Sequence, residues 1–426
     1  MGTPSGQIEH LDKVSPAGDI SLAPSAPGHQ AETVPAQEDW ADISREVYCI
    51  LGIPIDVVEM PEVLQRLDAA VARKAPFFIS TPNLDFLVIS QFDPHFRESL
   101  LLSDLCPADG MPIIWIAQLL GIPLRHRLAG SDIFDALKAP QRRASPLKVF
   151  LFGAAPGVAD AARRALNQAP GGLDCVGSMC PGFGTVEDMS RHDIISEINA
   201  SDAEFLVVSL GSEKGQSWLH RNHRRLRIPI RAHLGAVVNF QAGTVKRAPA
   251  IMRKIGAEWL WRIKEEPRLW RRYWRDGTAL LRLLLTHVLP LGMAAAWQRA
   301  LERLERQYLA ITKFEFDEHV VLALSGAACA RHAGNAAESF RDALLANKPV
   351  VLDCVDTRFI DARFIGLLLM LRKCLVNRGV TMRFAGVSPR LERMFRLNGA
   401  GYLLAPDRLR AGGAPMEIGS KAVGRA

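Results

Sequence analysis

Short apolar runs alternate with helical patterns over much of the chain. The runs occupy residues 77–80, 147–152 and 205–210, and glycine or small polar residues follow each of them. A helical pattern covers residues 112–120. Repeated strand, turn and helix signals predict an α/β fold with a Rossmann-like parallel sheet, which we assign to residues 41–245. In such sheets ligands bind beyond the carboxyl ends of the strands.

The pattern changes at residues 246–309. Arginine and lysine are interleaved there with tryptophan and tyrosine, and residues 279–296 form an apolar segment interrupted by Arg282, His287 and Pro290. A membrane-spanning helix needs about 20 apolar residues, so the interruptions favour an amphipathic helix at the membrane interface, with spanning as the alternative. We predict a membrane-associating appendage. Nucleic-acid binding is not expected, because no recognised binding module is present.

A second folded unit is predicted for residues 310–406. Its strands are expected at 319–324, 349–354 and 381–385, and its helices at 336–346, 364–378 and 389–398. This order predicts a small α/β domain. Residues 1–40 are rich in Pro, Ala, Gly and Ser without an apolar period, and residues 407–426 are rich in Gly and Arg. We therefore predict a disordered extension and a loose tail.

The net charge and the cysteine content indicate which binding partners and which kinds of site are compatible with this sequence. The 426 residues carry a formal net charge of +7, which suits an anionic membrane surface or a phosphorylated substrate. The 7 cysteines are odd in number and form no C-x-x-C pair, which argues against a disulfide framework or a zinc site. No basic segment followed by an apolar segment begins the chain, so we expect no signal peptide and a cytoplasmic protein.

Two short motifs follow predicted strands. Thr81 and Asn83 come after the run at 77–80, and Asp109 lies in a PADG motif between an apolar stretch and a helix. Thr and Asn also cap helices, and an Asp-Gly pair often only forms a turn. A carboxylate at a strand end can also act as a general base. We predict a catalytic site of Asp109, Thr81 and Asn83.

Later segments supply candidate substrate-binding residues. The segments are GSEKGQ (211–216), GAVVNFQAG (235–243), RAP (247–249) and a basic aromatic block at 256–273. The first follows a strand but matches neither G-x-G-x-x-G nor the Walker pattern, so its signal is weak by itself. The candidates are Gly211, Lys214, Gln216, Gly235, Asn239, Arg247, Arg268, Arg271 and Arg272.

Seven motifs follow one another along the chain: TPN, PADG, GSEKGQ, GAVVNFQAG, RAP, GAEWLWR and EEPRLWRRY. Taken in this order, they resemble the pattern of the WecG/TagA/CpsF glycosyltransferase family over about residues 47–273. The resemblance implies transfer of a hexose or N-acetyl-hexosamine from a UDP-sugar to a polyprenyl-diphosphate-linked sugar. It implies synthesis of a cell-surface polysaccharide or exopolysaccharide by a peripheral protein on the inner face of the bacterial plasma membrane. The implied reaction is inverting and independent of metal. No cofactor is expected, and the chain contains no D-x-D pair.

The chain departs from the family pattern at two places. The family loop G-x-P-k-Q-E has Pro, Gln and Glu where this chain has Glu213, Gly215 and Gln216, and the family's D-F is Asn239-Phe240 here. Contacts to the nucleotide-sugar can therefore differ, so the donor sugar stays open. Without a metal, arginine side chains and backbone N–H groups are the means of neutralising the leaving diphosphate.

Residues 314–404 resemble a STAS domain. The resemblance is carried by VVLDC (350–354), FID (359–361) and FAGVSPRLERMFRLNG (384–399). Phosphoregulated members have a D-S-S/T-G turn, whereas this turn has Ala362 and Arg363 after Asp361 and therefore no hydroxyl to phosphorylate. We expect the domain to bind a protein partner or the enzyme domain itself, and to be dispensable for the chemistry.

Two other functions fit parts of the sequence. A degenerate, non-catalytic scaffold acting through the STAS-like domain would explain the departures at 213–216 and 239, but the intact Thr81, Asn83 and Asp109 argue against it. A Rossmann-type dehydrogenase would need G-x-G-x-x-G after a strand, and the chain lacks this motif there.

Overall fold

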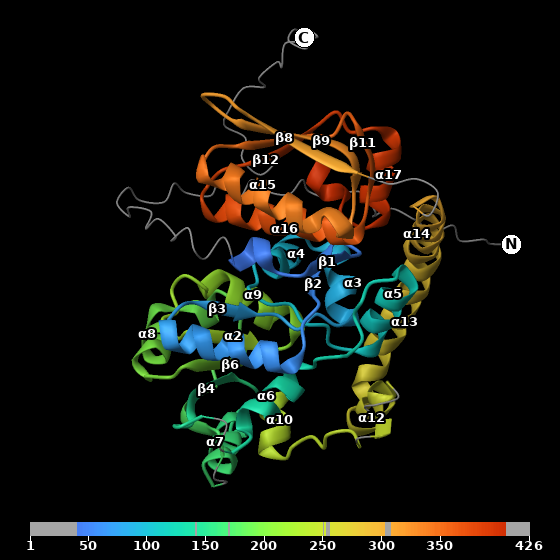
Figure 1. The fold of residues 1–426 in the computed structure, drawn as a ribbon. Helices are drawn as coiled ribbons and strands as arrows, with labels where there is room; N and C mark the ends of the chain where they lie inside the picture. Colours follow the sequence, from blue (N-terminus) through green and yellow to red (C-terminus); the bar gives the residue numbers. More distant parts are fainter. Residues whose placement is uncertain are drawn as a thin grey trace, which may run out of the picture.

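The computed structural model describes residues 41–140, 143–168, 171–249, 251–252, 256–302 and 308–405. Two α/β units are stacked on each other, and a long helical segment runs beside both (Figure 1). The extension predicted for residues 1–40 and the tail predicted for residues 407–426 lie outside the described residues.

The larger unit is built on a five-stranded sheet whose neighbouring strands are all parallel, in the order β3-β7-β6-β4-β5. The strands are β3 (Phe77–Ile79), β4 (Leu147–Gly153), β5 (Leu173–Met179), β6 (Phe205–Ser209) and β7 (Ile230–His233). The central strand β6 is buried at every position, as a parallel strand covered on both faces requires. The predicted parallel α/β sheet is therefore confirmed. The strand order reverses between β4 and β6, where a crevice for ligands forms in such sheets.

Helices cover both faces of this sheet. One face carries α2 (Met60–Arg73), α6 (Gly130–Lys138), α7 (Val158–Gln168) and α10 (Val237–Ala242). The other face carries α8 (His192–Ala200), α9 (Ser212–Asn222) and a short 3-10 turn (Asp188–Ser190). Helix α2 shows why they pack: its buried residues Val63, Leu67, Ala70 and Val71 recur at helical spacing on one side.

A further layer of the larger unit faces the second unit. It consists of the antiparallel hairpin β1 (Val47–Ile50) and β2 (Ile53–Asp56) with α3 (Leu84–Phe92), α4 (Pro94–Leu101) and α5 (Met111–Leu120). The apolar stretch before the PADG motif is not a strand. It forms only isolated bridges, between Leu105 and Ile79 and between Pro107 and Asp56.

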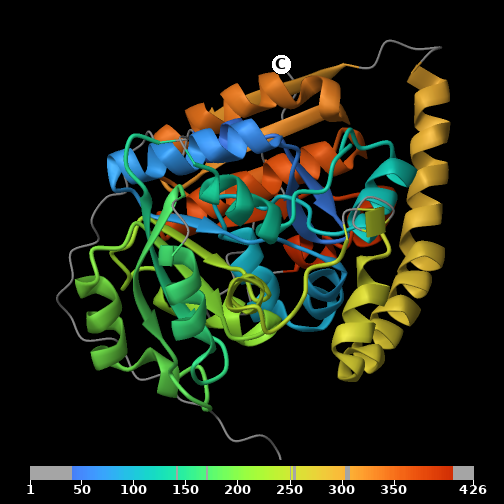
Figure 2. The same cartoon turned by 90° about the horizontal axis from the view of Figure 1, so that it is seen from below.

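The appendage begins with α12 (Glu258–Glu265) and a 3-10 turn (Pro267–Leu269). It continues as one long helix made of α13 (Trp270–Leu283), a π-helical turn (Leu284–Val288) and α14 (Leu289–Glu302). Pro290 has no N–H to donate to the carbonyl four residues earlier, and the widened turn lies directly before it. Figure 2 shows this helix standing along one side of the molecule. Residues 267–296 are long and apolar enough to cross a membrane, with a mean hydropathy of 1.6 in the relevant window.

The second unit is a mixed α/β domain. Its strands are β8 (Leu309–Glu315), β9 (Val320–Ala328), β10 (Val350–Asp353), β11 (Thr357–Ile360) and β12 (Met382–Ala385). Its helices are α15 (Ala333–Leu345), α16 (Ala362–Asn377) and α17 (Pro389–Leu397), with 3-10 turns at Ala330–His332 and Gly401–Leu404. The parallel order is β11-β9-β10-β12, and β8 pairs antiparallel with β9. Strands β8 and β11 are additional to the predicted elements.

The hydrophobic core of the second unit extends into the larger unit. Val47, Cys49 and Leu101 of the larger unit belong to the same buried cluster as the helices and strands of the second. Helix α16 lies directly on β1 (Figure 1), and a Cβ atom at Gly366 would come within 2.1 Å of the Val47 carbonyl oxygen. The second unit thus packs tightly on the larger one, and its expected dispensability for the chemistry stays a prediction.

Candidate active site

The TPN and PADG motifs converge at the carboxyl end of β3. Asn83 caps α3, since its Oδ1 accepts a hydrogen bond of 3.1 Å from the Phe86 N–H. The Asp109 N–H donates a hydrogen bond of 2.8 Å to the Pro82 carbonyl. The two loops therefore run against each other, and this contact brings together the regions of the three predicted catalytic residues, Thr81, Asn83 and Asp109.

The Asp109 carboxyl group lies at the N-terminus of α6, where it accepts a hydrogen bond from the Gly130 N–H. Glycine at position 130 allows close packing here, because a Cβ atom would lie 2.4 Å from Leu234 Cδ2 and the leucine side chain would have to move. Burial raises the pKa of Asp109 to about 7, against the opposing effect of Arg127. A carboxyl group with such a pKa can accept a proton near neutral pH.

Arg127 is a site residue that the sequence analysis missed. Its guanidinium group lies 2.6 Å from Glu258 Oε2 and 3.3 Å from Asp132 Oδ2, and its charge acts on Asp109. Glu258 begins α12 and belongs to the GAEWLWR motif, so this ion pair joins the appendage to the catalytic loops. Arg127 lies in no motif that we had singled out, and its position follows only from the fold.

Arg247 and Asn239 are both predicted to bind substrate, and in the structure both interact with other side chains of the protein. The Arg247 guanidinium pairs with Asp132 and Asp135 of α6, which fastens the RAP segment to that helix. Asn239 lies in α10, and its Oδ1 is 3.5 Å from Thr244 Oγ1. Their predicted contact with substrate therefore stays a prediction.

The segment GSEKGQ is not the polar loop that the sequence suggested. Gly211, with φ of 87°, ends the strand connection, and α9 begins immediately after it at Ser212. Gln216 therefore lies inside a helix and is fully buried, and its Nε2 donates a hydrogen bond of 2.5 Å to Ser80 Oγ. Lys214 Nζ donates to the Gly184 carbonyl at 2.8 Å, which ties the segment after β5 to α9.

The structure gives a reason for the departure at Gly215. A Cβ atom at this position would lie 2.1 Å from His233 Cδ2, so the imidazole ring fills the space of a side chain at 215. Burial lowers the pKa of His233 to about 4 and keeps the ring neutral. Among the residues that the structure describes, no hydrogen-bond partner reaches its buried Nε2 or the buried Gln216 Oε1. Gly235, also predicted to bind substrate, lies next to this ring.

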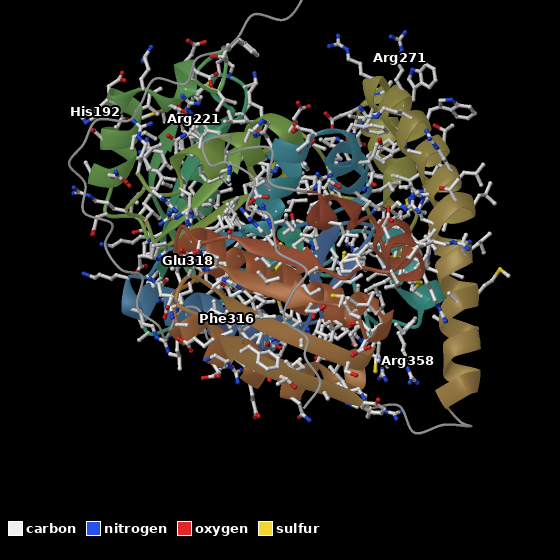
Figure 3. All side chains as sticks on the ribbon, turned by 90° about the horizontal axis from the view of Figure 1, so that it is seen from above. His192, Arg221, Arg271, Phe316, Glu318 and Arg358 are labelled. Carbon is white, nitrogen blue, oxygen red and sulfur yellow. The ribbon has the colours of Figure 1, made fainter. Side chains whose placement is uncertain are left out.

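Asp85 of α3 makes a second contact between the appendage and the candidate site, in addition to the Arg127–Glu258 ion pair. The Asp85 carboxylate lies 2.7 Å from Arg275 Nη2 and 3.7 Å from Arg272 Nε, and it accepts a hydrogen bond of 2.6 Å from Ser212. Arg272, one of the three arginines predicted to hold phosphate, thus contacts the helix that follows the TPN motif. Arg268 and Arg271 are exposed, and Figure 3 shows Arg271 projecting away from the molecule.

The crevice between β4 and β6 holds further backbone suited to an anionic ligand. The turn after β4 places Gly153 at φ of 104° and Ala154 at φ of 64°, and the Ala154 N–H donates to the Ser209 carbonyl at 2.6 Å. Helix α7 begins a few residues beyond this turn, and the N-terminus of a helix favours a negative charge. The signal for this feature was the GAAPG segment at 153–157.

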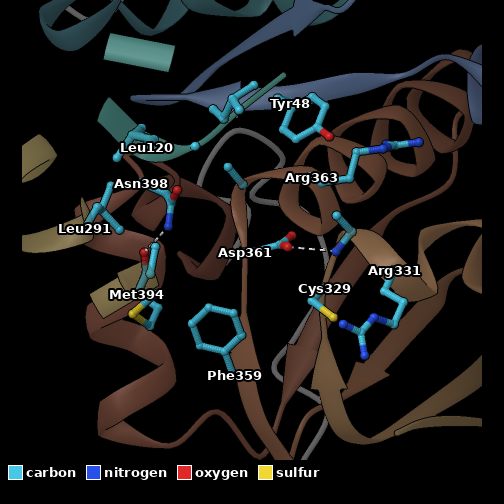
Figure 4. Close-up of a pocket in the computed structure, with 15 residues that line it drawn as sticks. Tyr48, Leu120, Leu291, Cys329, Arg331, Phe359, Asp361, Arg363, Met394 and Asn398 are labelled. Atoms are coloured by element: carbon cyan, nitrogen blue, oxygen red, sulfur yellow. Dashed lines mark hydrogen bonds between the residues drawn. The ribbon is translucent and has the colours of Figure 1, made fainter. Parts of the chain in front are cut away.

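A separate cavity of about 320 Å³ lies where α5, α14 and the second unit meet (Figure 4). It contains the turn at Asp361. The Asp361 carboxylate accepts hydrogen bonds from the Ala330 and Phe364 N–H groups. Arg363 donates to the carbonyls of Val47 and Arg45. The turn that carries phosphoserine in related domains is thus occupied by an arginine bonded to the enzyme unit.

Both units of the protein match known families. The model of the Glycosyl transferase WecG/TagA/CpsF family matches residues 48–292. The chain belongs to this family. Residues 313–405 match a family described as Mlab, STAS domain. The glycosyltransferase assignment and the STAS assignment made from the sequence are both confirmed.

Two relatives of this glycosyltransferase carry the same name, N-acetylglucosaminyldiphosphoundecaprenol N-acetyl-beta-D-mannosaminyltransferase. The protein of Bacillus spizizenii is 29% identical over 198 residues, which cover 46% of this chain and 74% of the relative. The protein of Staphylococcus aureus strain MW2 is 26% identical over 229 residues, which cover 53% of this chain and 86% of the relative. Both matches cover about half of this chain.

Proposed function

We propose that the protein transfers a hexose or N-acetyl-hexosamine from a UDP-sugar to a sugar carried on polyprenyl diphosphate. The observation that carries the proposal is the placement of Asp109, a partly buried carboxyl group with a pKa of about 7, between the TPN loop, α6 and Arg127. The names of the relatives support a polyprenyl-diphosphate-linked acceptor.

In the proposed reaction an acceptor hydroxyl oxygen attacks the anomeric carbon of the donor. Asp109 takes the hydroxyl proton, the bond from the anomeric carbon to the diphosphate oxygen breaks, and UDP leaves with the electron pair. A single displacement of this kind inverts the anomeric carbon. We propose that arginine side chains and backbone N–H groups stabilise the leaving diphosphate without a divalent cation. Arg272 and the amides at the start of α7 and α9 are the candidates.

We propose further that the appendage holds the enzyme on the inner face of the plasma membrane. Large apolar side chains on the long helix remain exposed, among them Trp270, Trp274, Leu281, Leu285 and Met293. Trp and Arg together suit the headgroup region of a membrane. The helix also packs against α3, α5 and α17 along its length. Because folded parts of the protein contact it near both ends, we propose that it lies on the bilayer and does not cross it.

The test is a transfer assay with a panel of UDP-sugars and a lipid-diphosphate-sugar acceptor. Mass spectrometry of the lipid should show one added sugar, and the reaction should continue in excess EDTA. The anomeric configuration of the product, read by NMR coupling constants, checks inversion. A panel that gives no extended lipid with a folded, vesicle-bound protein would count against the proposed transfer.

A further inference from the structure

A buried lysine of the STAS domain lies behind the catalytic strand. Lys373 of α16 is 2% exposed, and its ammonium group lies 2.6 Å from Asp104 Oδ1 and 2.9 Å from Asp42 Oδ2. It also donates a hydrogen bond of 3.3 Å to the Ser103 carbonyl. These charges raise the pKa of Lys373 and keep it protonated although it is buried. A cation from one unit is thus bound by carboxylates of the other.

Asp104 and Ser103, two of the three residues that Lys373 contacts, hold β3 and the residue after it. Asp104 Oδ2 accepts a hydrogen bond of 2.7 Å from the Phe78 N–H, and the Asp104 N–H donates to the Phe78 carbonyl at 2.8 Å. One residue earlier, Ser103 Oγ lies 2.6 Å from Ser80 Oγ, which also receives the hydrogen bond from Gln216. Segment 103–105 therefore fixes β3 just before Thr81.

The same segment leads into the loop of the general base. Asp109 is five residues beyond Asp104, and its N–H is bonded to Pro82 between Thr81 and Asn83. A shift of segment 103–105 would move both catalytic loops. Reacting groups must be held closely, since a misplacement of about 1 Å can cost about 10²-fold in rate.

We propose that Lys373 is a positioning residue: from the STAS domain it holds the strand that carries Thr81 and Asn83 and the loop that carries Asp109. The inference rests on the proposed transfer reaction. It gives the STAS domain a part in the geometry of the active site, through a contact that needs neither a phosphoswitch nor a partner protein.

The test compares Lys373→Met with Arg372→Ala in the full chain. Arg372 lies next to Lys373 and also joins the two units, through an ion pair of 2.8 Å with Glu98 of α4. We expect Lys373→Met to lower kcat at least tenfold with the donor KM changed less than about threefold. Arg372→Ala should keep kcat within about twofold of the parent.

Hydrogen exchange gives a readout that does not depend on activity. The amides of Phe78 and Ser80 should exchange faster in folded Lys373→Met and remain protected in Arg372→Ala. Parental kcat together with parental protection in Lys373→Met would overturn the proposal. An equal loss in both variants would also overturn it, because it would show that general weakening of the domain contact is sufficient.

Asp104→Asn provides a second variant should Lys373→Met fail to fold. The amide oxygen can still accept the Phe78 N–H, while the charge that binds Lys373 is gone. A reduced kcat with faster exchange at Ser80 supports the proposal, and parental values of both refute it. Absence of transfer by the parent protein would count against the proposed function, whereas the exchange measurements would still decide whether Lys373 holds β3.

Discussion

Replacing Asp109 with asparagine removes a carboxylate and leaves the size of the side chain nearly unchanged. If Asp109 is the general base, kcat should fall by about 10² to 10⁴, which is the usual contribution of base catalysis. Donor affinity should change little. If Asp109 only shapes a turn, asparagine serves equally well and activity should stay near that of the parent.

The same substitution should increase stability above neutral pH. The folded chain binds the Asp109 proton more tightly than the unfolded chain, because the pKa rises from 3.8 to about 7 on folding. Unfolding therefore releases this proton, and the Asp109 contribution to the free energy of unfolding falls as pH rises from about 4 to about 7. Three pKa units correspond to at most about 4 kcal/mol. Asparagine cannot ionise, so the variant should escape this loss.

The assay is thermal or denaturant unfolding of both proteins at pH 5 and pH 8, together with kcat and donor binding. The difference in stability between variant and parent should be larger at pH 8 than at pH 5. Asp135→Asn is the matched control, because it removes a more exposed carboxylate from the nearby helix α6. Activity within a few-fold of the parent would remove Asp109 from the mechanism. A pH-independent stability difference would refute the inferred burial of its charge.

Three other predictions follow from the site and the appendage. Arg127→Ala removes a cation that lowers the pKa of Asp109, so the acid limb of the kcat–pH profile should move to higher pH. An unchanged acid limb would show that Arg127 does not influence the ionisation of the catalytic base. Gly215→Ala should lower the free energy of unfolding by about 1 to 3 kcal/mol through its clash with His233, and His233→Ala in the same chain should restore much of that loss in an unfolding experiment. Replacing Arg268, Arg271 and Arg272 together by alanine should reduce the binding free energy for anionic vesicles by about 1 kcal/mol per arginine, measured by vesicle flotation. Unchanged flotation together with unchanged activity would contradict the proposed docking.

Much of the architecture could be predicted from the sequence because it depends on local patterns. Buried parallel strands need nearly continuous apolar runs, so 77–80, 147–152 and 205–210 were recognisable and correspond to β3, β4 and β6. The order of the family motifs identified the glycosyltransferase, and a turn without hydroxyls at Ala362 and Arg363 followed directly from the residues present. The PADG motif also indicated Asp109 as the general base, a role that stays a prediction.

The tertiary structure decided what depends on contacts between distant segments. Gln216 was expected in a loop, but α9 begins directly after Gly211 and buries it, and no local signal shows where a helix will start against a sheet edge. Arg127 could be recognised as a site residue only from the fold, which brings Glu258, 131 positions later in the chain, beside it. Lys373 has the sequence setting of an ordinary helix lysine, and its partners Asp42 and Asp104 lie 331 and 269 positions away. The sequence determined the elements and the chemistry available at their ends, whereas burial and long-range ion pairing determined which of those groups share a site.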